Sequence, residues 1–174
     1  MKIRIENIVG VIEFDKPVDL NQVLEKLKHL GIRRLKRLPG LKLRVNNTAI
    51  LIYKSKVIIA GVKNIKELET KAQRLIEVLN SEGIKVSMKS IRVENVTATV
   101  DLGFRVDLRK VAEILKGAYD PDYRPCVVAK VLGATVMLYN NGKALIIGAK
   151  DIDQVSSIVE FIIGSLNFRI RSCV

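Results

Sequence analysis

Apolar and polar residues alternate along several stretches of the chain, which is the pattern of strands with one buried face. The longest stretches, residues 2–14 and 89–101, are rich in Ile and Val. We expect both to be β-strands. Shorter strands are expected at 40–45, 48–54, 56–62, 126–132, 134–140 and 143–149.

Four other stretches carry apolar residues at helical spacing. Asp19 precedes one of them and Asn64 another, and both residue types favour helix N-caps. We expect helices over 20–30, 65–82, 107–117 and 151–165, followed by a last strand over 166–172.

The order of these elements occurs twice. Residues 5–27 and 93–115 are identical at eight of 23 positions, with a spacing of 88 that stays within two residues elsewhere in the chain. This is a tandem duplication, with repeats at 1–88 and 89–174. Each repeat alone is short of core and no Pro/Gly/Ser-rich linker divides them, so one continuous sheet is expected. The fold class is α+β.

The helices of each repeat cover one face of its strands only. If Ile8, Gly10 and Ile12 pack under the helices, then the alternate positions face away. Those positions are Ile5, Asn7, Val9 and Val11 in the first repeat and Val93, Asn95, Thr97 and Thr99 in the second. An uncovered apolar sheet face of this size is normally an interaction surface.

The formal net charge of +12 and the sequence pI near 9.9 predict a polyanionic partner, meaning nucleic acid or an anionic surface. The charge is uneven, +9 over residues 1–88 and +3 over 89–174. Much of the excess lies in one stretch: Lys26, Lys28, Arg33, Arg34, Lys36, Arg37, Lys42 and Arg44. The alternative is a solvated, thermophile-type surface rich in Lys, Arg and Glu.

Catalytic chemistry finds little support. The one histidine, His29, ends a basic helix, and Asp19 and Asp107 are expected to cap helices. No catalytic triad, metal-ligand spacing or glycine-rich phosphate loop occurs, so we expect no enzyme, no cofactor, no metal and no small-molecule substrate. Cys126 and Cys173 lie far apart, which favours a reducing compartment. No apolar run reaches membrane-spanning length, so an intracellular protein without a membrane partner is expected.

The doubled motifs resemble the TATA-box-binding protein family. The similarity covers essentially the whole chain and rests on the doubled I/V-E-N opening, the doubled V-D-L helix start, the turn LPGLKLRV with its counterpart RPCVVAKV, and G-V-K with G-A-K. This resemblance implies a ten-stranded antiparallel sheet bent into a saddle, with four helices on the convex face.

The resemblance also implies a DNA-binding surface on the concave face. Asn7 and Asn95 match the asparagines at its centre, beside Val9 and Thr97. A carboxamide NH₂ suits the acceptors that A·T pairs present in the minor groove. The alternative is a strand asparagine satisfied by backbone. Phosphate contacts are implied for Arg44, Lys56, Lys130 and Lys143.

The family kinks DNA with four inserted phenylalanines, and this chain has no phenylalanine at any of the four matching positions. The matching wedge positions hold Leu38, Tyr53, Arg124 and Tyr139. Two concave-face threonines of the family are replaced by Ala60 and Ile147. These departures weaken the expected DNA contacts without removing the saddle.

The family's acidic loop for docking transcription factor B matches residues 119–123, with Tyr119, Asp120 and Asp122 as the partner-binding residues. The alternative is a solvated turn in which Pro121 ends the preceding helix. The matching turn of the first repeat, GIRRLKRLP, is basic and would not bind the same surface.

Two functions follow from the resemblance. The first is a general transcription initiation factor that binds A·T-rich duplex DNA in the minor groove and recruits transcription factor B and, indirectly, RNA polymerase. The second is a divergent paralogue that regulates transcription mainly through protein partners, with weak or non-kinking DNA binding. Both place the protein in the cytoplasm of an archaeal-type cell, at the nucleoid.

Overall fold

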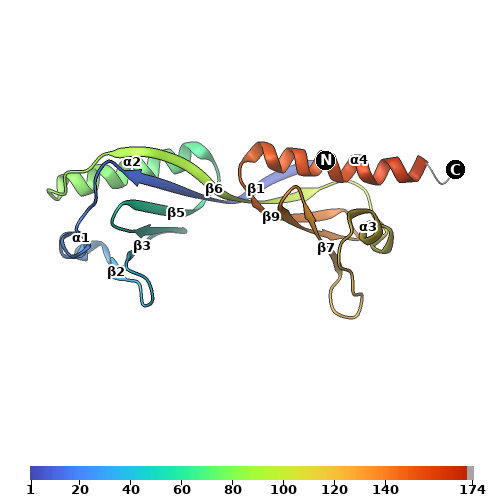
Figure 1. The fold of residues 1–174 in the computed structure, drawn as a ribbon, viewed down its shortest axis with the longest axis horizontal. Helices are drawn as coiled ribbons and strands as arrows, with labels where there is room; N and C mark the ends of the chain where they lie inside the picture. Colours follow the sequence, from blue (N-terminus) through green and yellow to red (C-terminus); the bar gives the residue numbers. More distant parts are fainter. Residues whose placement is uncertain (172–174) are drawn as a thin grey trace. The chain divides into compact units, whose positions relative to one another are not determined.

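The structure is a computed structural model, which describes the backbone of residues 1–171 and the side chains of residues 1–166. The chain forms two compact units (Figure 1). The N-terminal unit is Asn7–Glu94, and the C-terminal unit combines Met1–Glu6 with the chain from Asn95 onward. Strands β1 (Lys2–Phe14) and β6 (Met88–Asp101) therefore contribute a segment to each unit.

The N-terminal unit is an antiparallel sheet with the strand order β2-β3-β4-β5-β1. Its remaining elements are α1 (Leu20–Lys26), the 3-10 turn η1 (Lys28–Leu30), β2 (Arg33–Arg34), β3 (Leu41–Val45), β4 (Thr48–Ile52), β5 (Lys56–Val62) and α2 (Ile65–Ser81). The first predicted helix is therefore shorter than expected, because the α-helix ends at Lys26 and Gly31 closes the 3-10 turn in the left-handed region.

The C-terminal unit repeats this arrangement with the order β6-β9-β8-β7. Its elements are α3 (Leu108–Leu115), β7 (Cys126–Val131), β8 (Ala134–Tyr139), β9 (Lys143–Ala149) and α4 (Ile152–Arg171). The counterpart of β2 is reduced to a single bridge between Ala118 and Val128. The described residues thus form nine strands, one fewer than the resemblance implies.

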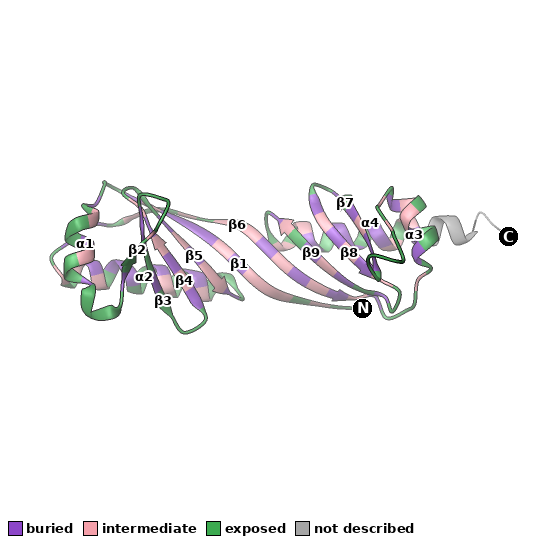
Figure 2. Ribbon diagram, turned by 90° about the horizontal axis from the view of Figure 1, so that it is seen from below, coloured by how far each residue is buried: buried purple, intermediate pink, exposed green. Residues whose placement is uncertain are grey.

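Helices cover one face of each sheet, as predicted. In the N-terminal unit, a Cβ added at Gly10 would lie 2.3 Å from a methyl carbon of Leu68 on α2, so Gly10 faces that helix. Ile8 and Ile12 are buried on the same side of β1. In the C-terminal unit, Ala98 and Val100 of β6 are buried in the same way. Figure 2 shows this alternation of buried and partly exposed positions along the strands.

Short polar residues start three of the helices, which confirms the predicted caps. Asp19 accepts a hydrogen bond from the Asn21 N–H at the start of α1, and Asp107 accepts from Arg109 and Lys110 at the start of α3. Asn64 accepts from the Glu67 N–H at 2.8 Å, while Glu67 accepts in return from the N–H of Lys63. These bonds satisfy N–H groups that a helix leaves unpaired at its first turn.

The prediction of a last strand over 166–172 is wrong, because α4 continues to Arg171. Val155, Ile158, Val159, Ile162 and Leu166 are buried, and this three- and four-residue spacing is that of a helix face. Burial of this apolar stripe favours a helix over the predicted strand. Position 172 and Cys173 lie outside the described residues.

Each unit carries a β-bulge, on β5 in the N-terminal unit and on β9 in the C-terminal unit. Ile8 pairs with Val62 while Val9 pairs with Ala60, so Gly61 is the extra residue on β5. Gly148 is the extra residue on β9 in the same way, between Ile147 and Ala149. Both glycines have positive φ values, +98° and +92°, which other residues rarely adopt.

Candidate nucleic-acid interface

The uncovered face of the N-terminal unit is apolar in the middle and basic at one edge. Its residues lie in two rows across the strands, set by the pairing register. The rows are Arg44, Ala49, Ala60 and Val9, and Lys42, Leu51, Ile58 and Val11. Val11 is only 4% exposed, so less of this face is accessible than the sequence predicts. The remaining apolar members of the rows are half-buried without a helix over them.

The uncovered face of the C-terminal unit has the same plan with more polar side chains. Its rows are Lys130, Thr135, Ile147 and Thr97, and Val128, Met137, Leu145 and Thr99. The Lys130 ammonium donates to the Thr135 hydroxyl at 2.7 Å, which holds the cation over the edge of the face. Ile147 is exposed on this face, where the matching Ala60 is half-buried.

Asn7 is held by the bulge of its own unit. Its side-chain oxygen accepts a hydrogen bond from the Gly61 N–H at 2.8 Å. This bond sets which end of the carboxamide is donor and which is acceptor, because an oxygen must face the N–H. The alternative of an asparagine satisfied by backbone therefore applies to the oxygen, and the NH₂ group has no recorded acceptor among the described residues.

Asn95 holds the matching position of the C-terminal unit but lacks the matching bond. Its side-chain oxygen is buried and has no hydrogen-bond partner among the described residues. A buried, unpaired carbonyl oxygen costs roughly 1–3 kcal/mol. The two repeats thus place the same side chain at the same position with different local energetics.

Charged residues of β1 and β6 reach the uncovered faces, which the sequence analysis did not predict. The Thr99 hydroxyl donates to a Glu6 carboxylate oxygen at 2.7 Å, and that oxygen also accepts from the Arg4 Nε at 2.5 Å. Because Thr99 lies on the uncovered face, Glu6 reaches that face where the simple alternation placed Ile5. No motif signalled this change of phase.

The N-terminal unit has an arginine and a glutamate at the matching positions, and its arginine has one additional carboxylate partner. Arg92 contacts Glu94 at 3.4 Å and Glu13 at 2.8 Å. The hydrogen bond from the Arg92 guanidinium, followed by one from Ser90, lowers the pKa of Glu13 below its usual value. Arg92 is therefore engaged on two sides by carboxylates.

The four predicted phosphate-contact residues, Arg44, Lys56, Lys130 and Lys143, are all exposed. Arg44 and Lys130 lie at equivalent edge positions, opposite Ala49 and Thr135 on the neighbouring strands. Lys56 and Lys143 begin β5 and β9. The structure thus gives each unit one cation at the edge of its face and one at the end.

The wedge positions lie in two environments. Leu38, 58% exposed, and Arg124, also exposed, lie in the loops before β3 and β7. Tyr53 and Tyr139 are half-buried near the ends of β4 and β8.

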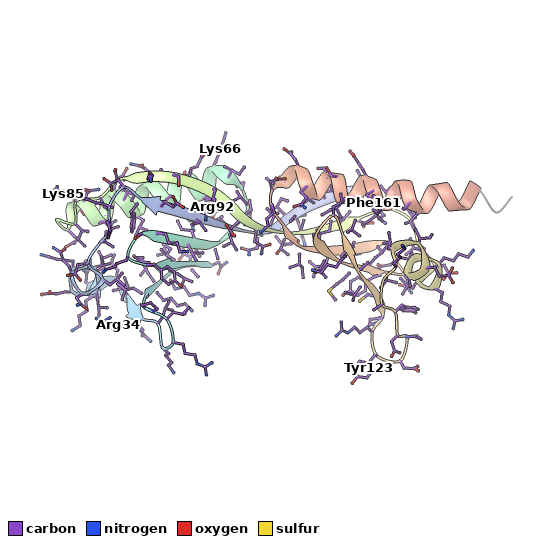
Figure 3. All side chains as sticks on the ribbon, viewed as in Figure 1. Arg34, Lys66, Lys85, Arg92, Tyr123 and Phe161 are labelled. Carbon is purple, nitrogen blue, oxygen red and sulfur yellow. The ribbon has the colours of Figure 1, made fainter. Side chains whose placement is uncertain are left out.

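Tyr123, next to Arg124, is 84% exposed, and Figure 3 shows it at the end of its loop. The sequence places Tyr123 in the acidic loop, and Tyr123 is not among the four predicted wedge positions. Tyr123 directly precedes Arg124, the position where the family has a phenylalanine, and this neighbourhood is the sequence signal for it.

The acidic loop is a hydrogen-bonded turn. Asp120 accepts from the Asp122 N–H through its side chain and from the Arg124 N–H through its backbone oxygen, at 3.1 and 2.8 Å. Asp122 is exposed and Tyr119 is half-buried. One of the two predicted acidic residues therefore holds the turn, while the other is presented to solvent.

Within residues 1–171, no group of His, Cys, Asp and Glu is placed to hold a metal ion. The described helices also include none that is long and apolar enough to cross a membrane. Cys126 is buried near Tyr139, its partner across β7 and β8.

The chain is a protein of two tandem α+β repeats. Each repeat has an uncovered sheet face bordered by cations. The family model described as transcription factor TFIID (or TATA-binding protein, TBP) matches residues 2–81 and 90–167. The chain belongs to this family, which consists of DNA-binding transcription initiation factors and not of enzymes.

The chain is similar to several curated proteins and to a solved structure. It is 30% identical to the TATA-box-binding protein of Aeropyrum pernix, over 91% of this chain and 81% of that protein. For the TATA-box-binding protein of Thermococcus celer the identity is 31%, over 86% and 82%. The structure of Methanococcus jannaschii TBP superposes with a TM-score of 0.83 at 26% identity, covering 96% of this chain and 99% of that one. These matches confirm the resemblance and the α+β fold class.

Proposed function

We propose that the uncovered faces of both units bind A·T-rich duplex DNA in the minor groove, and that the chain acts in transcription initiation with a transcription factor B-type protein and RNA polymerase. The observation that carries this proposal is the Asn7 carboxamide. Its oxygen is occupied by the Gly61 N–H, so the donors of its NH₂ group remain for a ligand.

Those donors match A·T pairs. The minor groove of A·T pairs offers only adenine N3 and thymine O2 as acceptors, whereas a G·C pair adds the guanine N2 amino donor. Val9 and Ala60 pair with each other across β1 and β5, close in sequence to Asn7 and its partner Gly61, and their apolar side chains offer no acceptor to that amino group. A G·C pair at this point would bury an unsatisfied donor, which disfavours it.

The cations supply affinity without sequence preference. Arg44, Lys56, Lys130 and Lys143 lie at the edges and ends of the faces, and neutralising phosphates with such residues releases counterions. Binding should therefore weaken steeply with salt. Leu38, Tyr53, Tyr139 and the exposed Tyr123 are the wedge candidates, and hydroxyls on three of the four favour a smaller kink than four phenylalanines would give.

The same turn that carries Tyr123 is our candidate for the protein partner. Asp122 is exposed on a hydrogen-bonded turn and offers a carboxylate to a basic surface of the transcription factor B-type partner. A second candidate function, a paralogue that acts through protein partners, is favoured by the exposed Arg124 where the family has a wedge.

A competition assay distinguishes these functions. A bend-reporting duplex with a TATA-type site is compared with a G·C-rich duplex of equal length, for the wild type and for the Asn7→Ala/Asn95→Ala variant. A·T-selective binding that the double substitution abolishes supports the proposal. Binding that is weak and unselective in both proteins contradicts it and favours the paralogue.

A further inference from the structure

An open hollow of about 500 Å³ lies on the uncovered face of the C-terminal unit. Three cationic side chains line it: Lys2 and Arg4 from β1, and Lys143 from the start of β9. Thr99, Leu145, Tyr139 and one acidic residue, Asp101, are among its other lining residues. Neither lysine forms an ion pair with any residue in the described part of the chain.

Arg4 is held from one side only. Its Nε donates to Glu6, which is fixed in turn by the Thr99 hydroxyl. The two terminal nitrogens of the guanidinium have no recorded partner among the described residues, and the side chain is 71% exposed. A guanidinium anchored through Nε presents its terminal N–H groups in a fixed direction, which suits an oxyanion.

The residue at the matching position of the N-terminal unit is differently placed. Arg92 uses Nε toward Glu94 and a terminal nitrogen toward Glu13, and its side chain is 50% exposed. The counterpart of Glu13 is Asp101, whose shorter side chain accepts from the Gly103 N–H at 2.9 Å. Asp101 therefore holds its own loop, and no ion pair joins it to Arg4 within residues 1–166.

We infer that the Lys2–Arg4–Lys143 hollow is a phosphate-binding site for the DNA backbone, present in the C-terminal unit and closed by Glu13 in the N-terminal unit. Arg4 is the principal contact, and Glu6 is a positioning residue that acts through it. This inference rests on the proposed function. It adds Lys2 and Arg4 beside Lys143, which is already one of the four phosphate-contact residues expected from the sequence.

The test uses the full chain and the pair of arginines as matched variants. Binding of a TATA-type duplex is measured as a function of salt for the wild type, Arg4→Ala and Arg92→Ala, and thermal unfolding checks that each variant is folded. Losing one phosphate contact lowers the slope of log K against log salt by about one. Losing a hydrogen bond to a charged group weakens binding about tenfold.

We expect the lower slope and weaker binding for Arg4→Ala, with Arg92→Ala close to the wild type. The inference is overturned if Arg4→Ala keeps the wild-type salt slope, or if both variants lose the same binding affinity. In that case, A·T-selective binding of the wild type still leaves the proposed function intact. If the wild type binds no duplex, the proposed function fails first. Arg4→Gln, which keeps a polar side chain of similar reach, repeats the test should Arg4→Ala prove unstable.

Discussion

Gly61 and Gly148 are equivalent residues with different surroundings. Both have positive φ values in the bulge of their unit. A Cβ at Gly61 would lie 2.3 Å from the backbone oxygen of Asn47, whereas a Cβ at Gly148 would meet nothing within 4 Å. The requirement for glycine is therefore conformational at Gly148 and both conformational and steric at Gly61.

Alanine substitutions separate these two requirements. Gly148→Ala should cost about 1–3 kcal/mol of unfolding free energy, the usual penalty for a residue in a sparsely populated backbone region. Gly61→Ala should cost clearly more unfolding free energy, because the turn between β3 and β4, which contains Asn47, must also move away from the new methyl group. Urea unfolding of both variants measures the difference. Equal losses would mean that the contact with Asn47 is easily relieved.

At the scale of elements, the helix starts could be predicted because capping depends on neighbouring residues alone. Asp19, Asn64 and Asp107 each bond an N–H within three residues, so their sequence context was sufficient. The end of α4 could not be predicted in this way. The turns that carry Ile162 and Leu166 are helical because these side chains are buried in the unit, and burial depends on residues distant in sequence.

The start of α2 offers a direct test of capping. Asn64→Ala removes the bond to the Glu67 N–H and should lower stability by about 1 kcal/mol. Glu69→Ala, at an exposed position in the same helix, is the control and should change stability by less than about 0.5 kcal/mol. Thermal unfolding measured for both variants decides the matter, and a neutral Asn64→Ala would show that the first turn is satisfied by water.

For the whole molecule, duplication made the fold predictable and hid the differences between repeats. Matching positions such as Asn7 and Asn95 identified the candidate interface from the sequence. The sequence did not reveal that only Asn7 has a backbone donor for its oxygen, or that Arg4 and Arg92 have different partners. These differences depend on side-chain geometry within each unit, which repeat identity does not determine.

The asparagine pair turns this asymmetry into a prediction. Asn7→Ala leaves the Gly61 N–H without its acceptor and should cost about 1–3 kcal/mol of stability. Asn95→Ala removes a buried oxygen that had no partner, which relieves its desolvation cost, so it should be neutral or stabilising. Chemical unfolding of the two single variants tests this difference. A larger loss for Asn95→Ala would mean that its oxygen is bonded in solution, for example to water.

The hairpin between β8 and β9 has a consequence for chemical ageing. Asparagine followed by glycine, as in Asn141-Gly142, is prone to deamidation when the glycine nitrogen attacks the asparagine side chain, and asparagine is among the residues most sensitive to heat. Here the Gly142 N–H is donated to the Tyr139 oxygen, and the Asn141 side-chain oxygen accepts from the Lys143 N–H, both at 3.0 Å.

The attacking nitrogen is thus hydrogen-bonded while the hairpin is closed, and the asparagine side chain is held in place by its own hydrogen bond. Deamidation should therefore follow the fraction of time that the hairpin is open, and peptide mapping after heating should find it much faster in urea than in the folded protein. Each event would place a new negative charge beside Lys143, at the edge of the hollow. The rate at which the protein loses affinity for DNA on ageing would then depend on how often this hairpin opens.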